Sequence, residues 1–446
     1  MELKKVTKNY IQKRGEDLHF MKEKIMQKSS YCLNCKLKPC SNKGCPLGND
    51  IPLFIEKIKE EKYKEAYETL CETTVLQAIC GRICPHKKQC QGACVRGIKG
   101  DPVSIGDLEA YIGDIALKED YEIPSYSDVE RIAENNHKLS NKKIAIVGGG
   151  PAGLTCAAFL AKNDIKVTIY EKYDYLGGLL VHGIPDFRLP KEIVEKTINK
   201  ILKLGIEVKY NMELGKNLSL KELERDYDAI FLSFGANKSI KMGIEGENLE
   251  GVYGGNELLE HNLYPDYEGK TVVVIGGGNV AMDSARTIKR LGAKRVIVIY
   301  RRSKDEMPAE EKEYLDAKKE NIEFLFKTNI VKILGSGKVE KVELIKTELI
   351  KKDDDKRPSP IEIKGSNYTI DADGVVMALG SKTEDFVTNL NLKLNKWQNI
   401  EIDEFNKTSN GKIFAGGDLA GAKQTVAWAA KSGRDAAQNI IKYFEN

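Results

Sequence analysis

The sequence lacks any long run of apolar residues. Its amino terminus, MELKKVTKNYIQKRGEDLHF, is polar from the first residues and has no apolar stretch of the secretory kind. No apolar run elsewhere approaches the roughly 18 residues that cross a membrane. We therefore expect a cytoplasmic protein that has no membrane partner.

An excess of one charge sign is also missing, and histidine is scarce. The 70 basic and 66 acidic residues leave a net charge of +4, and no basic stripe predicts a nucleic-acid partner. None of the 5 histidines is placed like the base partner of a nucleophile, so we expect no catalytic residue of the histidine or serine kind. The 446 residues are enough for two or three globular domains.

The 10 cysteines are concentrated in one part of the chain. Nine of them lie between Cys32 and Cys94, and only Cys156 lies elsewhere. A reducing compartment disfavours disulfides, so dense cysteines indicate metal or redox chemistry. They form two arrays, Cys32-x2-Cys35-x4-Cys40-x4-Cys45 and Cys80-x3-Cys84-x5-Cys90-x3-Cys94. Such spacings suit iron–sulfur ligation, and zinc is the open alternative because Cys-x2-Cys pairs also form structural zinc sites.

Charged segments around the arrays have helical periodicity. Segment 54–70 is predicted to be helical, with one apolar face made by Ile55, Ile58, Ala66, Tyr67 and Leu70. The polar stretch 127–143 is predicted to be a linker that contains a short helix. From Lys142 onward, short apolar strands that end in glycines alternate with helical segments, and this pattern predicts parallel sheets.

The first glycine-rich unit reads KKIAIVGGGPAGLTCAAFLAKNDIKVTIYEK. Gly148, Gly150 and Gly153 form G-x-G-x-x-G between a strand and a helix, which allows a pyrophosphate to approach the helix N-terminus. Glu171 ends the next strand, where a carboxylate accepts hydrogen bonds from ribose hydroxyls. The alternative is a tight turn in a sheet that binds no ligand. Motif, strand and acid together favour a dinucleotide site.

The second unit, TVVVIGGGNVAMDSARTIKRLGAKRVIVIYRRS, is a duplicate of the first. Gly276, Gly278 and Ala281 form the G-x-G-x-x-A variant. Arg301 and Arg302 stand where the first unit has its acid, and guanidinium groups bind a 2′-phosphate that an acid would repel. This arrangement predicts NADP(H) over NAD(H). The alternative is that both arginines are a solvated strand end.

Two later segments complete the pattern. KIFAGGDLAG places Asp418 after a strand and a Gly-Gly turn, where a carboxylate suits the hydroxyls of a ribityl chain. TVAWAAKSGRDAA then begins a helix whose N-terminus stabilises negative charge on a reduced flavin. The motifs VGGGPAG, YLGGLLVHGIPDFRLPK, IGGGNVAMD, YRRS and FAGGD together resemble the pyridine-nucleotide/FAD half of the glutamate synthase small (beta) subunit. Dihydropyrimidine dehydrogenase and the NADP-binding subunits of bifurcating ferredoxin oxidoreductases share this module.

The resemblance implies an α/β fold in which an α-helical iron–sulfur domain precedes two Rossmann-like domains. We expect the [4Fe–4S] domain at 1–135 and an NADP domain at 237–373, inserted between FAD-domain parts at 141–236 and 374–446. The residues implied to touch FAD are Gly148, Gly150, Ala152, Gly153, Glu171, Gly178, Arg188, Asp418 and Val426. Those implied to touch NADP(H) are Gly276, Gly278, Asn279, Val280, Arg301 and Arg302.

The resemblance also implies two interleaved [4Fe–4S] clusters. Cys32, Cys35, Cys40 and Cys94 are expected to hold one cluster. Cys45, Cys84 and Cys90 are expected to hold the other, with Glu109 as a non-cysteine fourth ligand; the alternative is that Glu109 is an ordinary surface residue. The family treats the equivalent of Cys80 as a packed cysteine, and Cys71 and Cys156 are predicted to be small buried residues.

The chain departs from the family at two points. Four residues, 41–44, separate Cys40 from Cys45 where the family has three. Pro85 is followed by His86, Lys87 and Lys88 where the family has Gln-Glu. Neither departure removes a ligand.

The resulting hypothesis is hydride transfer between NADPH and FAD, followed by single-electron transfer through the clusters. A separate large subunit of the glutamate synthase type is the expected partner. The main rival is the NADP(H)-handling subunit of a bifurcating ferredoxin oxidoreductase or of a sulfide dehydrogenase, with a ferredoxin-linked partner. A rival of another class is a non-catalytic nucleotide-binding scaffold stapled by zinc.

Overall fold

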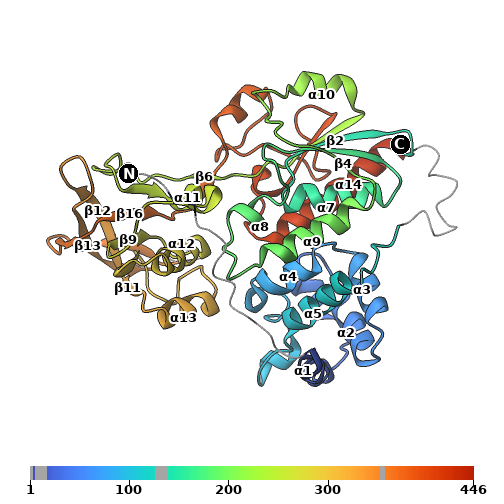
Figure 1. Ribbon diagram of the computed structural model, residues 1–446, viewed down its shortest axis with the longest axis horizontal. Helices are drawn as coiled ribbons and strands as arrows, with labels where there is room; N and C mark the ends of the chain where they lie inside the picture. Colours follow the sequence, from blue (N-terminus) through green and yellow to red (C-terminus); the bar gives the residue numbers. More distant parts are fainter. Residues whose placement is uncertain (1–3, 6–17, 126–138, 352–356, 446) are drawn as a thin grey trace. The chain divides into compact units, whose positions relative to one another are not determined.

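The computed structural model describes residues 4–5, 18–125, 139–351 and 357–445, with side chains from residue 22 onward. The chain forms two compact units (Figure 1). One, the inserted unit, contains residues 182–185 and 237–384 together with residues 4–5. The other, the main unit, contains the remainder. Most of the linker expected at 127–143 lies outside the described residues.

The amino-terminal part of the main unit is helical. Asp50 caps the second of its helices by accepting a hydrogen bond from the backbone of Leu53. Short helical turns at Cys40–Gly44, His86–Lys88 and Val95–Ile98 carry or flank the cysteines. The longer helices are α1 (Leu18–Ser30), α2 (Ile51–Lys59), α3 (Tyr63–Cys71), α4 (Gln77–Ile83) and α5 (Ile105–Lys118).

The predicted helix over 54–70 is two helices. Its apolar residues are buried as expected, but Glu61 has a φ of 57°, which breaks the helix between α2 and α3. The apolar period continues across the break because both helices pack on the same core. Periodicity therefore identified the buried face and missed the turn.

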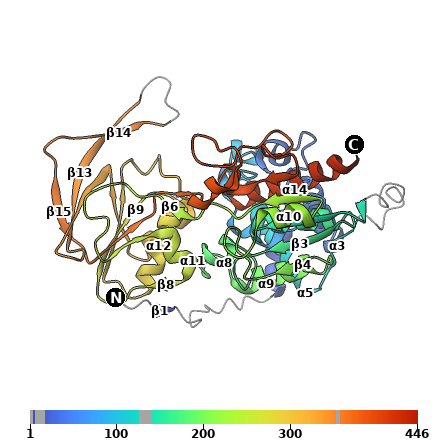
Figure 2. The ribbon, with the colours of Figure 1, turned by 90° about the horizontal axis from the view of Figure 1, so that it is seen from above.

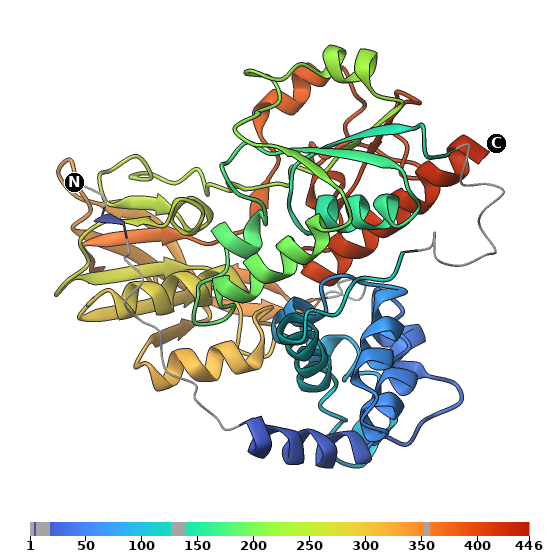
Figure 3. The ribbon, with the colours of Figure 1, turned by 45° about the vertical axis from the view of Figure 1, so that its right-hand side comes forward.

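A five-stranded parallel sheet with the order β18-β5-β2-β3-β4 forms the rest of the main unit. Helix α14 packs against α7, as Figure 3 shows for the red carboxy-terminal helix. The central strands β2 and β3 are buried after an exposed first lysine, because helices and loops cover both faces of the sheet. The elements are β2 (Lys143–Val147), α7 (Pro151–Ala161), β3 (Lys166–Tyr170), α9 (Lys191–Leu202), β4 (Glu207–Lys209), β5 (Ala229–Leu232), β18 (Ile413–Ala415) and α14 (Val426–Glu445).

The inserted unit contains a second five-stranded parallel sheet with the order β11-β10-β9-β16-β7. An antiparallel sheet accompanies it, in which β13 pairs with β12, β14 and β15 (Figure 2). The elements are β7 (Val252–Gly254), β9 (Thr271–Ile275), α12 (Asn279–Arg290), β10 (Arg295–Tyr300), α13 (Glu311–Lys319), β11 (Glu323–Phe326), β12 (Thr328–Leu334), β13 (Lys341–Ile350), β14 (Ser359–Glu362), β15 (Tyr368–Asp371) and β16 (Gly374–Met377).

Smaller elements complete the described chain. They are β1 (Lys4–Lys5), α8 (Leu179–His182), α10 (Leu220–Asp226), β6 (Lys238–Ser239), α11 (Gly255–His261), β8 (Leu263–Tyr264) and β17 (Ser381–Lys382). No helix among the described residues is both long and apolar enough to cross a membrane.

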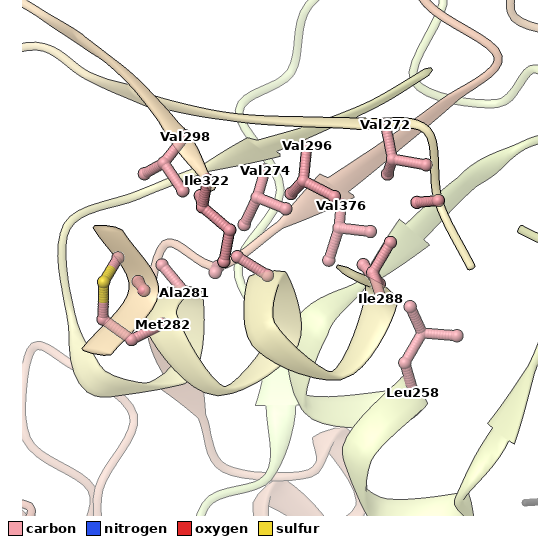
Figure 4. Close-up of a cluster of buried hydrophobic side chains, with 14 of the residues drawn as sticks. Leu258, Val272, Val274, Ala281, Met282, Ile288, Val296, Val298, Ile322 and Val376 are labelled. Atoms are coloured by element: carbon pink, nitrogen blue, oxygen red, sulfur yellow. The ribbon is translucent and has the colours of Figure 1, made fainter. Parts of the chain in front are cut away.

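The core of the inserted unit lies between α12 and the parallel sheet. Figure 4 shows Ala281, Met282 and Ile288 of α12 facing valines of the strands. Each fully buried valine or isoleucine of this kind contributes about 1.5–3 kcal/mol. This packing fixes where β9 ends and α12 begins, which is the second glycine-rich turn.

The boundary expected at residue 374 differs from the structural division. Strand β16 pairs with β9 and β7, so it belongs to the sheet of the inserted unit, and the division falls after Glu384. An apolar strand followed by a glycine fits either sheet, and only the pairing decides between them. The fold class is confirmed: an α-helical head and two parallel α/β units, one of them inserted in the other.

Candidate cofactor sites

The first glycine-rich turn joins β2 to α7. Gly148 has a φ of 101°, and a Cβ there would lie 2.6 Å from the Cα of Phe234. A side chain on Gly153 would collide with the carbonyl of Gly148. Gly150 precedes α7, and Gly178 lies beside it across the turn. The predicted glycines therefore meet at the N-terminus of α7, which offers free backbone N–H groups to an anion.

Glu171 follows β3, as predicted, and holds the same turn. Its Oε2 accepts a hydrogen bond from Gly149 N at 2.8 Å, and its Oε1 accepts one from Tyr173 N at 3.1 Å. Burial raises the pKa of this carboxyl, and the two backbone hydrogen bonds oppose that rise. Glu171, which is expected to bind a ribose, therefore also stabilises the glycine-rich turn through these hydrogen bonds.

Asp418 lies just after β18 and close to the start of α14. Its Oδ1 is buried and has no hydrogen-bond partner among the described residues, although the residue as a whole is half-buried. Burial raises the pKa of this carboxyl to about 6. A buried oxygen of this kind fits a ligand hydroxyl, which is the role expected of it toward FAD.

The other residues expected at FAD lie around the same turn. Ala152 is in the first turn of α7, and its carbonyl lies so close to Gly433 of α14 that a side chain on Gly433 would collide with it. Val426 is the first residue of α14. Arg188 is half-buried on the segment between α8 and α9. The start of α7 thus packs closely against α14 (Figure 1).

The second glycine-rich turn joins β9 to α12 in the inserted unit. Gly276 has a φ of 139°, and nothing lies within 4 Å of the position that a Cβ would take on Gly278. Asn279 begins α12, and its Oδ1 accepts a hydrogen bond from Glu310 N at 3.0 Å. Val280 is partly buried against the core of this unit. Like the first glycine-rich turn, this turn leads into a helix whose N-terminus is open.

Arg301 and Arg302 directly follow β10, as predicted. Arg301 is exposed, whereas Arg302 is half-buried and its Nε donates to Pro358 O at 3.0 Å. Sequence reasoning missed Glu306, whose Oε2 accepts from the backbone and the hydroxyl of Ser303. The Ser303 hydrogen bond lowers the pKa of Glu306, so this site contains a fixed negative charge close to Arg302.

The first set of cysteines, Cys32, Cys35, Cys40 and Cys94, lines a single pocket. Cys40 is buried, and the other three are partly exposed. Burial raises the pKa of the Cys40 thiol to about 11; hydrogen bonds from Ser41 oppose this rise, and Cys94 and Cys32 add to it slightly. Thiols that are distant in sequence therefore meet in the combination that the family resemblance implies.

The second set, Cys45, Cys84, Cys90 and Glu109, lies deeper in the main unit. Burial raises the pKa of Cys45 to about 12 and that of Cys90 well above its usual range, and Glu109 is the next contributor to both. Burial also raises the pKa of Glu109 to about 8. Cys45 and Cys84 keep some accessible surface even though protein atoms surround them closely. Glu109 is 5% exposed and is not the ordinary surface glutamate of the alternative interpretation.

The thiols and the carboxyl of the second set suit a cofactor whose iron atoms carry positive charge. These groups are hard to ionise alone, because burial disfavours their charged forms. No three or more histidine, cysteine or acidic side chains among the described residues are grouped so that they could hold one metal ion. A [4Fe–4S] cluster makes a different demand, since each ligand binds a different iron atom.

The remaining cysteines are buried. Cys71 and Cys156 are fully buried, as predicted. Cys80 is 1% exposed and contacts Cys84 through its thiol, which places a fourth sulfur beside the second set.

Three residues around the second set were not predicted. Asn49 donates from Nδ2 to Glu109 Oε1 at 3.2 Å and accepts from Thr73 Oγ1 at 2.7 Å. The backbone N–H of Ala427, the second residue of α14, donates to the thiol of Cys84. Arg434 of α14 donates to Leu47 O at 2.5 Å and to Thr73 O at 3.2 Å. One helix therefore contacts both the expected flavin site and the second set.

Comparisons with known proteins identify the families that match the two parts of the chain. Residues 142–436 match the pyridine nucleotide-disulphide oxidoreductase family, and residues 10–121 match dihydropyrimidine dehydrogenase domain II, 4Fe-4S cluster. The glutamate synthase [NADPH] small chain of Escherichia coli (strain K12) is 36% identical over 435 residues, which are 93% of this chain and 90% of that protein.

One further similar sequence and one similar structure match different shares of the chain. The NADP(+)-dependent formate dehydrogenase subunit beta of Moorella thermoacetica is 36% identical, and the match covers 91% of this chain and 60% of that protein. The structure of Mycobacterium tuberculosis FprA in complex with NADPH is similar with a TM-score of 0.61 at 21% identity, over 68% of this chain and 85% of that one. The latter likeness shows the fold alone.

Proposed function

We infer a route for electrons through named residues, from the premise that this chain belongs to the pyridine nucleotide-disulphide oxidoreductases and to the family of the glutamate synthase small chains. The chain is an NADPH-dependent oxidoreductase that uses FAD and iron–sulfur chemistry. FAD, when bound, accepts two electrons from NADPH and releases them one at a time. We propose that this chemistry takes place in the cytoplasm, where NADPH and reduced cysteines are expected.

The FAD site is proposed at the first glycine-rich turn. The N-terminus of α7 would bind the pyrophosphate, Glu171 a ribose and Asp418 the ribityl hydroxyls. The unpartnered, buried Oδ1 of Asp418 supports this assignment. Gly148, Gly150, Ala152, Gly153, Gly178, Arg188 and Val426 complete the proposed site.

The NADP(H) site is proposed at the second turn, with Gly276, Gly278, Asn279 and Val280 at the start of α12. Exposed Arg301 is the better candidate for the 2′-phosphate, because Arg302 already bonds the backbone of Pro358. Replacing Arg301 by Glu should weaken the use of NADPH far more than that of NADH. Equal losses with both nucleotides would contradict the assignment.

We propose two [4Fe–4S] clusters, one for each set of donors. The observation that carries the proposal is that the fold gathers two separate sets, the deeper of which receives a hydrogen bond from Ala427 of α14. Because α14 also begins at the proposed flavin site, the second set is the natural first acceptor. The first set, with three partly exposed cysteines, is the natural exit.

The proposed partner is a larger catalytic subunit of the glutamate synthase type. The extent of the match to small chains of that enzyme supports it. The match to a formate dehydrogenase subunit beta supports a second candidate, a subunit that handles NADP(H) for a different redox enzyme, such as a bifurcating ferredoxin oxidoreductase. Addition of the large subunit should make NADPH oxidation depend on glutamine and 2-oxoglutarate in the first case only.

Anaerobic purification tests the cofactor proposal. The protein should be brown-yellow, contain about eight irons per chain and show two reduced-cluster signals in electron paramagnetic resonance. A colourless, zinc-loaded protein would instead support a scaffold held together by zinc. A yellow protein with about four irons would retain the flavin assignment and refute the second cluster.

A further inference from the structure

Large apolar side chains are exposed on the two segments that contain cysteines of the first set. Leu37 and Ile98 are 85% and 76% exposed, and Leu33 is 52% exposed. Single exposed apolar residues are common, but several around one feature indicate an interaction surface. We call Tyr31, Leu33, Leu37, Val95 and Ile98 the apolar rim.

The rim joins two segments that are distant in sequence. Leu33 and Val95 both line the pocket that contains the four cysteines. Arg96 lies 4.1 Å from the ring centre of Tyr31, and its Nε donates to Tyr31 O at 3.0 Å. The segments 31–37 and 95–98 are therefore tied to each other, and their exposed side chains belong to one surface.

The two segments of the apolar rim carry more basic than acidic residues, although Lys38 is paired with Asp50 of a neighbouring helix cap. Segments 31–43 and 94–101 contain five basic residues, Lys36, Lys38, Lys43, Arg96 and Lys99, and a single acidic one, Asp101. The whole chain is close to balanced, with 70 basic and 66 acidic residues. The basic excess is thus local to the pocket, and it would favour a partner with acidic residues at its own rim.

We propose that the apolar rim is the docking face for a redox protein or subunit whose own redox centre is surrounded by apolar residues and an acidic border. This proposal rests on the function proposed above, in which the first set is the electron exit. A second copy of this chain fits poorly, because a two-fold interface would place the same basic residues against one another. The position of the rim around the cysteines favours a redox protein over a membrane surface.

Binding by the full chain, purified anaerobically with its cofactors, tests the proposal. The probes are an acidic two-cluster ferredoxin, the basic cytochrome c and vesicles of phosphatidylglycerol. The ferredoxin should bind, and binding should weaken as salt rises. The double variant Lys36→Glu/Lys99→Glu should weaken binding by about fivefold or more, and Leu37→Ser/Ile98→Ser by about tenfold with little change in salt dependence.

Matched control variants lie far from the pocket in sequence. Lys216→Glu and Leu315→Ser change an exposed lysine and an exposed leucine elsewhere, and they should bind the ferredoxin as the parent protein does. Ferricyanide reduction by NADPH and the cluster signals should be the same in all variants, because a small acceptor needs no docking face.

Several outcomes would overturn the proposal. They are equal ferredoxin binding by the rim and control variants, tighter binding of cytochrome c, or binding of the vesicles in place of the ferredoxin. If the cluster signals are intact in these cases, only the docking face is refuted. If the parent protein contains no clusters, the proposed function itself has failed.

Discussion

Arg434 ties the carboxy-terminal helix α14 to the loops of the second cysteine set. Its guanidinium donates to Leu47 O, two residues after Cys45, and to Thr73 O, and its side chain is only 12% exposed. The hydroxyl of the same Thr73 orients Asn49, which in turn donates to Glu109. Arg434 also pairs with its neighbour Asp435 through Nη2 at 3.3 Å. Replacing Arg434 by Met keeps most of the apolar stem and removes all three hydrogen bonds.

The free energy of unfolding that Arg434→Met removes can be worked out from these contacts. Each hydrogen bond from a charged donor contributes about 1.5–3 kcal/mol. The Nε of Arg434 is buried without a partner, which costs about 1–3 kcal/mol in the parent protein and offsets part of the gain. Arg434→Met should therefore lower the free energy of unfolding by about 2 kcal/mol. If the loss is local, it corresponds to roughly a 30-fold fall in hydrogen-exchange protection.

Hydrogen exchange of the anaerobic holoprotein, followed by mass spectrometry, measures this quantity. The fall should be confined to peptides that cover residues 45–49 and 71–76. Lys431→Met, on the same helix, removes only a partly exposed pair with Asp435 and should change little. Unchanged protection in those peptides, or an equal fall throughout the chain, would refute the idea that Arg434 locally holds the second set.

Four further predictions concern the sites themselves. Glu109→Ala should remove roughly half of the bound iron and one of the two cluster signals, because the variant leaves only three of the four ligands at the second set. Full iron content would show that Glu109 is not a ligand. Cys80→Ala should retain both signals, since Cys80 packs against Cys84, and loss of a signal would make it a ligand. Asp418→Asn should weaken FAD retention on dilution, and unchanged retention would remove Asp418 from the site. In the flavin-free protein, the pKa of Asp418 is raised to about 6 from 3.8, so its stabilising contribution is present at low pH and lost as the pH rises through 6. Asp418→Asn should therefore be more stable than the parent by about 2–3 kcal/mol at pH 7.5 and by about half of that at pH 5, as measured by denaturant titration; an equal difference at both pH values would contradict this.

The glycine-rich turns could be predicted because their chemistry is local. A turn that must pass from strand to helix beside a phosphate restricts the backbone within six residues, and Gly148 and Gly276 both have positive φ as this requires. The gathering of the cysteines could be predicted only through a family resemblance. Spacing along the chain does not say that Cys94 joins Cys32, because the path between them passes through α2, α3 and α4.

Other features could not be predicted because they depend on pairings between distant segments. Glu61 interrupts a continuous helical period, and nothing in its side chain marks it as a break. Strand β16 reads equally well as part of either sheet. Asn49 and Arg434 are ordinary polar residues in sequence, and their importance comes from the carbonyls and the carboxyl that the fold brings to them.

Helix α14 connects the two halves of the proposed electron route. Its N-terminus has a partial positive charge, which favours an electron-rich flavin and also the thiolate of Cys84 that accepts from Ala427. Two turns further on, Arg434 fixes the loop that follows Cys45. A shift of α14 that alters flavin binding must therefore also alter the hydrogen bonds of the second set. The same helix therefore contacts both the proposed flavin site and the second set.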